Sequence, residues 1–97
     1  MQLAEGLKIL HERQDPILYR DLKPEHVLIS RGRDGVRVRL LDLGCACRQS
    51  EAWKSKAGSR GYAAPEQLAD GTGEQGACSD IYSFGKILVK MAADRGM

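Results

Sequence analysis

The sequence has few aromatic residues, little net charge and no long apolar run, and each absence narrows what the chain can be. Only 5% of the 97 residues are aromatic, so we do not expect a large self-sufficient core in a chain this short. A net charge of +2 gives no argument for nucleic-acid binding. The sequence also predicts no membrane segment and no signal peptide, because no apolar stretch has the required length or flanking residues.

Cysteines are also scarce, and their number is odd. Cys45 and Cys47 are too close together for an easy disulfide, and Cys78 stands alone. The spacing lacks a second C-x-x-C pair or a nearby histidine, which argues against a zinc site built on thiols. We therefore interpret the cysteines as small apolar residues in a reducing compartment and predict a cytoplasmic location.

Two segments have the periodicity of amphipathic helices. Leu3, Leu7 and Leu10 predict a helix over residues 2–13, which ends before Asp15-Pro16 because the residue before a proline avoids the helical region. Ser79 is expected to cap a second helix over about residues 79–93. One face of that helix is predicted to hold Ile81, Phe84, Leu88 and Met91.

Between these helices the sequence predicts a β-hairpin. Residues 27–29 are a short apolar run, typical of a strand buried on both faces. Asp34-Gly35 is a strong turn signal, and residues 36–40 then alternate between apolar and basic side chains, as in a half-buried strand. Four arginines are expected to form a solvated face of this hairpin: Arg31, Arg33, Arg37 and Arg39.

Residues 44–64 hold no convincing period and predict a long loop, which in a compact domain is usually functional or disordered. Pro65 is expected to open a short helical turn that reaches Leu68, because proline is tolerated at the first helical position. Residues 70–73 (DGTG) predict another loop.

Three short motifs follow one another in a fixed order. Residues 19–26 (YRDLKPEH) lie between the first helix and the hairpin, residues 42–44 (DLG) follow the hairpin, and residues 64–66 (APE) close the long loop. A match of three residues is weak evidence by itself, but all three in this order are strong evidence. In this order the chain resembles the protein kinase family, and the resemblance covers most of its length.

The resemblance implies an α+β fold: residues 1–97 would be part of the C-terminal lobe, mainly helical, with a small hairpin beside the catalytic loop 19–26 and an activation segment over 42–66. Lys23 is typical of serine/threonine kinases, and residues 58–67 and 79–85 resemble their bacterial branch. The expected activity is transfer of the γ-phosphoryl group of ATP to a serine or threonine of a protein substrate.

Phosphoryl transfer is mostly positioning and charge compensation, which explains the residue types that the resemblance assigns. Asp21 would be the catalytic base, and Lys23 would steady the transferred group. Asp42, in the metal motif 42–44, would hold Mg²⁺ against the phosphates of ATP, since magnesium prefers oxygen ligands. Leu28 would pack beneath the adenine ring, with Ile87 and Met91 behind it.

Supporting roles are implied in the same way. Arg20 would pair with a phosphorylated residue of the activation segment. Ser55 and Ser59 are the candidates for that phosphate, although the motif position of Ser59 favours hydrogen bonds to the base and the lysine. Asp80 would hold the backbone of the catalytic loop, and Glu66 would normally pair with a buried arginine.

Several features depart from the family pattern. His26 stands where active kinases have an asparagine that binds a second metal ion, and an imidazole suits zinc, copper or nickel better than magnesium. Leu43 replaces a phenylalanine but keeps an apolar side chain. The glycine-rich loop, the rest of the N-terminal lobe and the C-terminal helices are expected to be missing, which would leave Glu66 unpaired and expose the apolar faces of both helices.

We therefore expect a kinase fragment that is inactive by itself and depends on its missing N-terminal lobe or parent chain. Two alternatives remain open. The first is a pseudokinase or protein-interaction module without catalysis, which the histidine at position 26 favours. The second is a truncated remnant without function.

Overall fold

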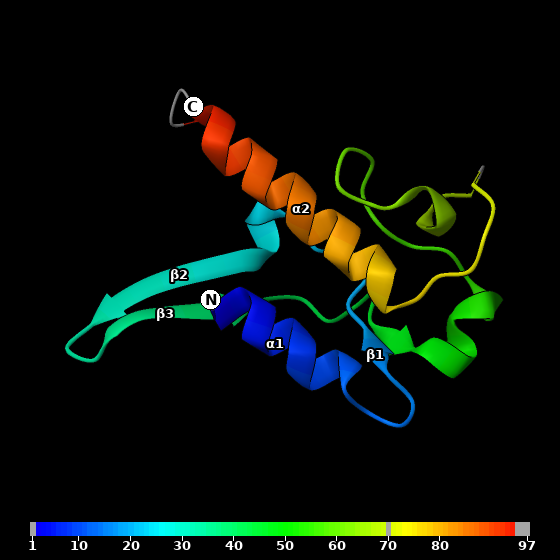
Figure 1. The fold of residues 1–97 in the computed structure, drawn as a ribbon, viewed down its shortest axis with the longest axis horizontal. Helices are drawn as coiled ribbons and strands as arrows, with labels where there is room; N and C mark the ends of the chain where they lie inside the picture. The colour runs from blue at the N-terminus through cyan, green and yellow to red at the C-terminus, as the bar shows by residue number, and fades with distance from the viewer. Residues whose placement is uncertain (1, 70, 95–97) are drawn as a thin grey trace.

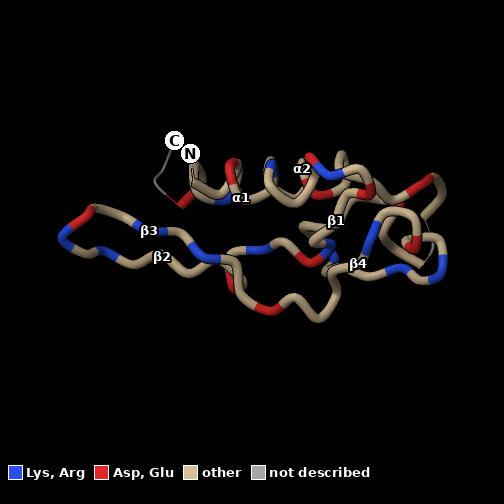
Figure 2. The backbone as a smooth tube through the Cα atoms, turned by 90° about the horizontal axis from the view of Figure 1, so that it is seen from below, with Lys and Arg blue, Asp and Glu red and all other residues tan. Residues whose placement is uncertain are grey.

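A computed structural model describes residues 2–69 and 71–94, and the predicted loop residue Asp70 lies outside them. The fold is α+β (Figure 1). Two helices, α1 (Gln2–His11) and α2 (Ala77–Asp94), lie on one side of a layer of strands and loops, as Figure 2 shows. None of the helices in the described ranges has the length and apolar character needed to cross a membrane.

Helix α1 forms where the leucine spacing predicts it, with Leu3 and Leu7 buried on its inner face. It ends at His11, two residues earlier than expected. The carbonyl of residue 12 would need the N–H of residue 16 to continue the helix, and Pro16 has none. The proline therefore acts on the helix one turn before its own position.

Helix α2 differs from the prediction in both its start and its buried face. It begins at Ala77, and the hydroxyl of Ser79 accepts a hydrogen bond from the Gly76 backbone N–H at 3.1 Å. Ser79 thus caps from the third helical position instead of from the N-cap. Ile81, Leu88 and Met91, predicted on the apolar face, are 55%, 41% and 41% exposed.

The buried face of α2 is largely polar and consists of Ser79, Asp80, Ser83 and Ile87. Its polar members have partners in the loops beneath; for example, the Ser83 hydroxyl donates to the Tyr62 carbonyl at 2.7 Å. Hydrogen bonding to those loops therefore decides which face of α2 points inward.

The β-hairpin forms as predicted from β2 (Val27–Gly32) and β3 (Gly35–Leu40). Gly32 pairs with Gly35, whose φ of +102° suits glycine, so the turn residues are 33 and 34. The base of the hairpin lies beside α1, where the Gln2 side chain accepts the Val38 backbone N–H at 2.7 Å, and its tip projects beyond the helices (Figure 1). Its four arginines are exposed, as expected: Arg31, Arg33, Arg37 and Arg39.

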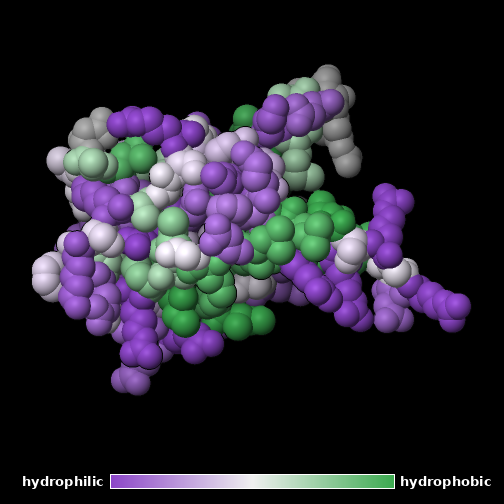
Figure 3. All heavy atoms as spheres, turned by 180° about the vertical axis from the view of Figure 1, so that it is seen from behind, coloured by the Kyte–Doolittle hydropathy of each residue, from purple (hydrophilic) through white to green (hydrophobic). Residues whose placement is uncertain are grey.

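The prediction that residues 27–29 are buried on both faces is wrong. Leu28 and Ile29 are 45% and 59% exposed, because β2 pairs with β3 alone in a two-stranded sheet. The apolar surface where the hairpin meets the body is visible in Figure 3. Leu43, which keeps an apolar side chain at its position, is 61% exposed.

Residues 44–64 are more regular than predicted. Strand β4 (Cys47–Arg48) pairs antiparallel with β1 (Ile17–Leu18), and a 3-10 helix (Gln49–Lys54) follows it. Two-residue strands are too short to produce a period in the sequence. The short turn after Pro65 is present as a 3-10 helix (Pro65–Gln67).

The core lies where α1, the loop after β1 and α2 meet. Five buried side chains form it: Leu3, Leu7, Tyr19, Leu22 and Ile87. The expected exposed patch is therefore only half right, since the face of α1 is covered while Ile81 and Leu88 of α2 remain exposed.

We expect Leu7→Ala to lower the free energy of unfolding by about 2–5 kcal/mol, because Leu7 is 1% exposed and its truncation leaves a cavity. Ile9→Ala, on the same helix but 67% exposed, should change it by less than about 0.5 kcal/mol. Urea unfolding of both variants measures the difference. Equal effects would show that α1 does not pack as described.

Candidate active site

The backbone of the loop 19–26 is held by one buried carboxylate of α2. Asp80 is 0% exposed, and its two oxygens accept the backbone N–H groups of Tyr19 at 2.7 Å and Arg20 at 2.9 Å. The His11 Nε2 atom lies 2.8 Å from the same carboxylate. The sequence predicts the role of Asp80 through resemblance, but nothing in it indicates His11 as a third partner.

The carbonyl side of the same loop is held by Gln67, which sequence reasoning missed. The amide nitrogen of Gln67 donates to the carbonyls of Arg20 and Ala57, and its oxygen accepts the Ala64 backbone N–H. Gly58 has a φ of +137°, and a Cβ there would lie 2.8 Å from the Gln67 nitrogen. The close approach of the two segments thus requires glycine at this position.

Asp21, Lys23 and Ser59 lie together, although Ser59 is 38 residues from Asp21. The Ser59 hydroxyl donates to Asp21 Oδ1 at 2.7 Å and accepts from Lys23 Nζ at 3.0 Å. Lys23 Nζ lies 4.0 Å from the other oxygen of Asp21. The predicted base and the predicted cation are therefore adjacent, and one hydroxyl links them.

Asp42 and His26 face each other across the end of the hairpin. Asp42 adopts a φ of +57°, and its Oδ1 accepts the Gly44 backbone N–H at 2.9 Å. The other oxygen, Oδ2, lies 3.8 Å from His26 Nε2. The second ring nitrogen of His26, Nδ1, lies 2.7 Å from the Asp21 carbonyl oxygen.

The side chain of Arg20 points into the segment after Asp42. It is 6% exposed, and its guanidinium donates to the carbonyl of Cys45 at 2.6 Å and to the carbonyl and hydroxyl of Ser55 at 3.1 and 3.3 Å. Gln75, which the sequence did not indicate, also accepts from it at 3.4 Å. The structure therefore brings together Arg20 and one of its two predicted phosphate sites.

Tyr19, the first residue of the loop 19–26, is fully buried. Its hydroxyl donates to the Leu41 carbonyl. Burial, together with the carboxylates of Asp42 and Asp21, raises the pKa of Tyr19 to about 12. The phenol therefore stays neutral at physiological pH and can keep donating to the strand before Asp42.

The structure also places the other residues that the sequence predicted for the site. Glu66, expected to lack its arginine partner, accepts the Ser79 hydroxyl at 2.7 Å. Leu28 is half-exposed, while its neighbour Val27 packs against the core cluster that contains Ile87. Met91 is 41% exposed.

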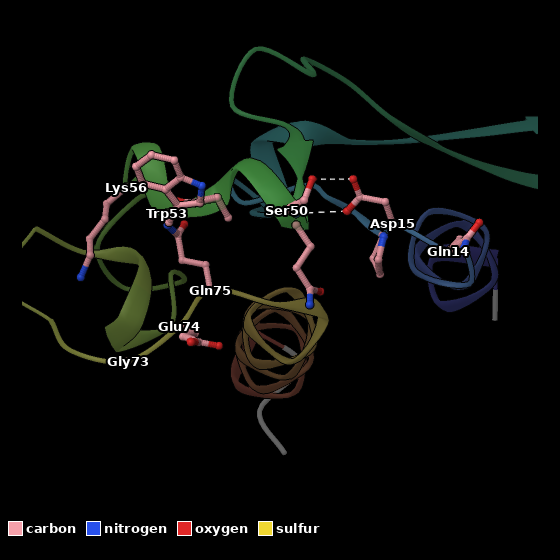
Figure 4. Close-up of a pocket in the computed structure, with 11 residues that line it drawn as sticks. Gln14, Asp15, Ser50, Trp53, Lys56, Gly73, Glu74 and Gln75 are labelled. Atoms are coloured by element: carbon pink, nitrogen blue, oxygen red, sulfur yellow. Dashed lines mark hydrogen bonds between the residues drawn. The ribbon is translucent and has the colours of Figure 1, made fainter.

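A pocket lies apart from this chemistry. Figure 4 shows residues that line it. It has a volume of about 540 Å³ and lies beside the 3-10 helix (Gln49–Lys54), with Trp53 and Glu74 on its wall. Asp15 Oδ2 accepts the Ser50 hydroxyl at 2.6 Å, and Asp15 Oδ1 accepts the Ser50 backbone N–H at 3.1 Å. Neither Asp21 nor Asp42 lines this pocket, so we treat it as separate from the site.

Within residues 2–69 and 71–94, no group of three or more histidine, cysteine, aspartate or glutamate side chains is placed to hold a metal ion. The three cysteines are free thiols. A metal at this site would therefore take some of its ligands from water or from a bound phosphate.

Comparison with known proteins decides the family. Residues 1–96 match the profile described as the protein kinase domain. This chain belongs to the protein kinase domain family.

The relatives are serine/threonine and receptor-like kinases. The chain is 38% identical over 97 residues to the EPD1-interacting receptor-like cytoplasmic serine/threonine-protein kinase 5D of Gossypium barbadense, covering 95% of this chain and 20% of that protein. It is 39% identical over 97 residues to receptor-like cytoplasmic kinase 176 of Oryza sativa subsp. japonica, covering 95% and 23%. Serine/threonine-protein kinase ksp1 of Schizosaccharomyces pombe is 37% identical over 95 residues, covering 94% and 20%.

The chain thus spans about a fifth of the length of these relatives. They are plant and yeast proteins, so they do not support the resemblance to the bacterial branch.

The Asp15–Ser50 contact predicts a pH-dependent contribution to stability. Hydrogen bonds from the Ser50 hydroxyl and backbone hold the pKa of Asp15 below its ordinary value of 3.8. A lowered pKa in the folded state stabilises the fold above the ordinary value, and this contribution disappears as the pH falls through the lowered one.

Ser50→Ala should therefore lower the free energy of unfolding at about pH 6 and have a smaller effect at about pH 3. Urea unfolding at the two pH values measures the difference. Ser30→Ala, on the exposed hairpin, is the matched control and should show no such change. An effect of Ser50→Ala that is equal at both pH values would contradict the assignment.

Proposed function

We propose that this chain is the part of a serine/threonine protein kinase C-terminal lobe that carries the catalytic loop and the activation segment 42–66. The observation that carries the proposal is the hydroxyl of Ser59 linking Asp21 to Lys23. Because the chain spans about a fifth of its relatives, we propose the activity for the whole protein that contains it. Its partner would be a protein substrate that offers a serine or threonine hydroxyl.

Asp21 would orient the substrate hydroxyl and accept its proton. Ser59 occupies Oδ1, while Oδ2 lies 4.0 Å from Lys23 Nζ, so the free edge of the carboxylate lies next to a positive charge. The ionised carboxylate is the form that acts as a base. Lys23 would then compensate the negative charge that develops on the transferred phosphoryl group.

Asp42 would hold a metal ion, and the residues fit magnesium only in part. The carboxylate is 65% exposed, and its Oδ2 is free of backbone donors in the described hydrogen-bond pattern, which suits a hard cation. The imidazole of His26 suits magnesium poorly. In the family, magnesium neutralises the phosphates of ATP; in this chain, Asp42 would supply the carboxylate ligand and Leu28 an apolar surface for the adenine ring.

Arg20 and Ser55 would form the regulatory contact. The Arg20 guanidinium lies 3.3 Å from the Ser55 hydroxyl, so a phosphate on that hydroxyl would meet a charge that already faces it. Arg20 is held in place by the Cys45 carbonyl and by Gln75. We propose Ser55 over Ser59 as the modified residue, because the Ser59 hydroxyl is engaged by Asp21 and Lys23.

Further features of the whole protein are proposals of the same kind. Asp80 would act as a structural residue beneath the catalytic loop. Glu66, beside Ser79, would act as a regulatory residue at the end of the activation segment. A cytoplasmic location is proposed because the name of the Gossypium barbadense relative contains the word cytoplasmic.

A protein-interaction module without catalysis is the second candidate. It is favoured by the position of His26, whose Nε2 faces the Asp42 carboxylate at 3.8 Å. A protonated imidazole there would pair with the carboxylate that the metal needs. Phosphate transfer assays separate the two candidates.

Asp21→Asn, in the protein that contains this chain, should reduce phosphate transfer to a protein substrate by at least about 100-fold, because an amide cannot accept the proton. The control Asp34→Asn removes a carboxylate from the exposed hairpin turn and should leave the rate unchanged. Transfer of radiolabelled phosphate from ATP gives both rates. Full activity of Asp21→Asn would contradict the assigned base, and no transfer by either protein would favour the interaction module.

A further inference from the structure

In both His26 and Asp42, one polar side-chain atom makes a hydrogen-bond contact with the backbone, and the second polar atom faces the partner side chain. Asp42 Oδ1 accepts the Gly44 backbone N–H at 2.9 Å, and His26 Nδ1 lies 2.7 Å from the Asp21 carbonyl oxygen. The two remaining atoms, Oδ2 and Nε2, lie 3.8 Å apart. These backbone contacts therefore orient a carboxylate oxygen and an imidazole nitrogen toward each other.

The Asp21 carbonyl also fixes where the proton of the imidazole lies. A backbone carbonyl can only accept, so Nδ1 must carry the hydrogen. In the neutral ring this leaves the lone pair on Nε2, the nitrogen that faces Asp42. A metal-bound histidine in proteins is typically held in this manner, with its other ring nitrogen donating to a carbonyl or carboxylate.

The ring itself is fixed by its surroundings. The His26 side chain is 14% exposed, and its ring meets the Tyr19 ring edge-on, with centroids 6.3 Å apart and planes at 70°. Tyr19 is itself buried, and its hydroxyl donates a hydrogen bond to the Leu41 carbonyl. Asp42, by contrast, has a side chain that is 65% exposed, so it is the partner that can move.

The separation is close to that required for ligands of one small cation. Zinc bonds of about 2.0–2.2 Å at tetrahedral angles place two ligand atoms roughly 3.4 Å apart. The observed 3.8 Å therefore needs a movement of roughly half an ångström by Asp42. Mixed nitrogen and oxygen ligands favour zinc and its neighbours in the first transition row over magnesium.

We propose that His26 Nε2 and Asp42 Oδ2 form a two-ligand site that binds a zinc-like divalent cation in preference to magnesium. This inference rests on the proposed function to the extent that the phosphates of a nucleotide, or water, complete the coordination. It goes beyond that function by assigning the histidine as a ligand that changes the choice of metal.

Side-chain ¹⁵N spectra of the histidines in the whole chain test this directly, with ZnCl₂ or MgCl₂ added and no nucleotide present. The chain has two histidines. His11, which is hydrogen-bonded to Asp80, therefore serves as the internal control. Zinc should shift the Nε2 signal of His26 while Nδ1 keeps its proton and His11 stays unchanged. Magnesium at the same concentration should leave both residues unchanged.

Asp42→Asn is the matched variant, because its exposed side chain and its Gly44 contact make it compatible with the fold. It should weaken zinc binding at least about tenfold, as expected when a ligand charge is lost. Asp34→Asn, at the exposed hairpin turn, should bind zinc as the unchanged chain does.

Three results would overturn the proposal: zinc that leaves His26 Nε2 unmoved, magnesium that shifts it equally, or zinc taken up by the thiols of Cys45 and Cys47 instead. Because the titration contains no nucleotide, any of these results leaves the proposed phosphoryl transfer untouched. Conversely, an inactive protein that still shows the zinc response would contradict the proposed function alone.

Discussion

The site depends on the buried carboxylate of Asp80. It is 0% exposed and would be costly to bury without donors, and it receives them from the backbone of Tyr19 and Arg20, about sixty residues earlier, and from His11. Asp80 in turn gives these two consecutive backbone N–H groups a fixed hydrogen-bond acceptor on α2. This pairing joins α1, the loop and α2 into one unit, and it explains why the inner face of α2 is polar.

A second clamp completes the positioning. Gln67 holds the Arg20 carbonyl while Asp80 holds the Arg20 N–H, so the peptide groups on both sides of this residue are fixed. Arg20 can then keep its left-handed backbone at a φ of +70°, an uncommon conformation for a residue other than glycine. Its side chain points toward Ser55, and the next residue, Asp21, presents its carboxylate to Ser59. The contacts proposed for catalysis and regulation thus depend on the constrained backbone of Arg20.

Local patterns predicted the local structure, and contacts between distant segments account for most of the rest. The leucine spacing gave α1, and Asp34-Gly35 gave the hairpin, because both signals lie within the element that they predict. The burial of residues 27–29 and the inner face of α2 were predicted wrongly, since both depend on what lies opposite. The kinase motifs led to the candidate site through resemblance. Its supporting residues carry no signal in a single sequence, because their partners lie far away: His11, Gln67 and Gln75.

Hydrogen exchange of single backbone amides tests most directly whether Asp80 holds the catalytic loop. In Asp80→Asn, one acceptor oxygen becomes a donor that faces another donor, so we expect the amides of Tyr19 and Arg20 to exchange at least about tenfold faster. The amides in the middle of α1 should keep their protection. Unchanged exchange at Tyr19 and Arg20 would contradict the account, and equal acceleration throughout α1 would mean that Asp80 supports the whole fold instead of the loop.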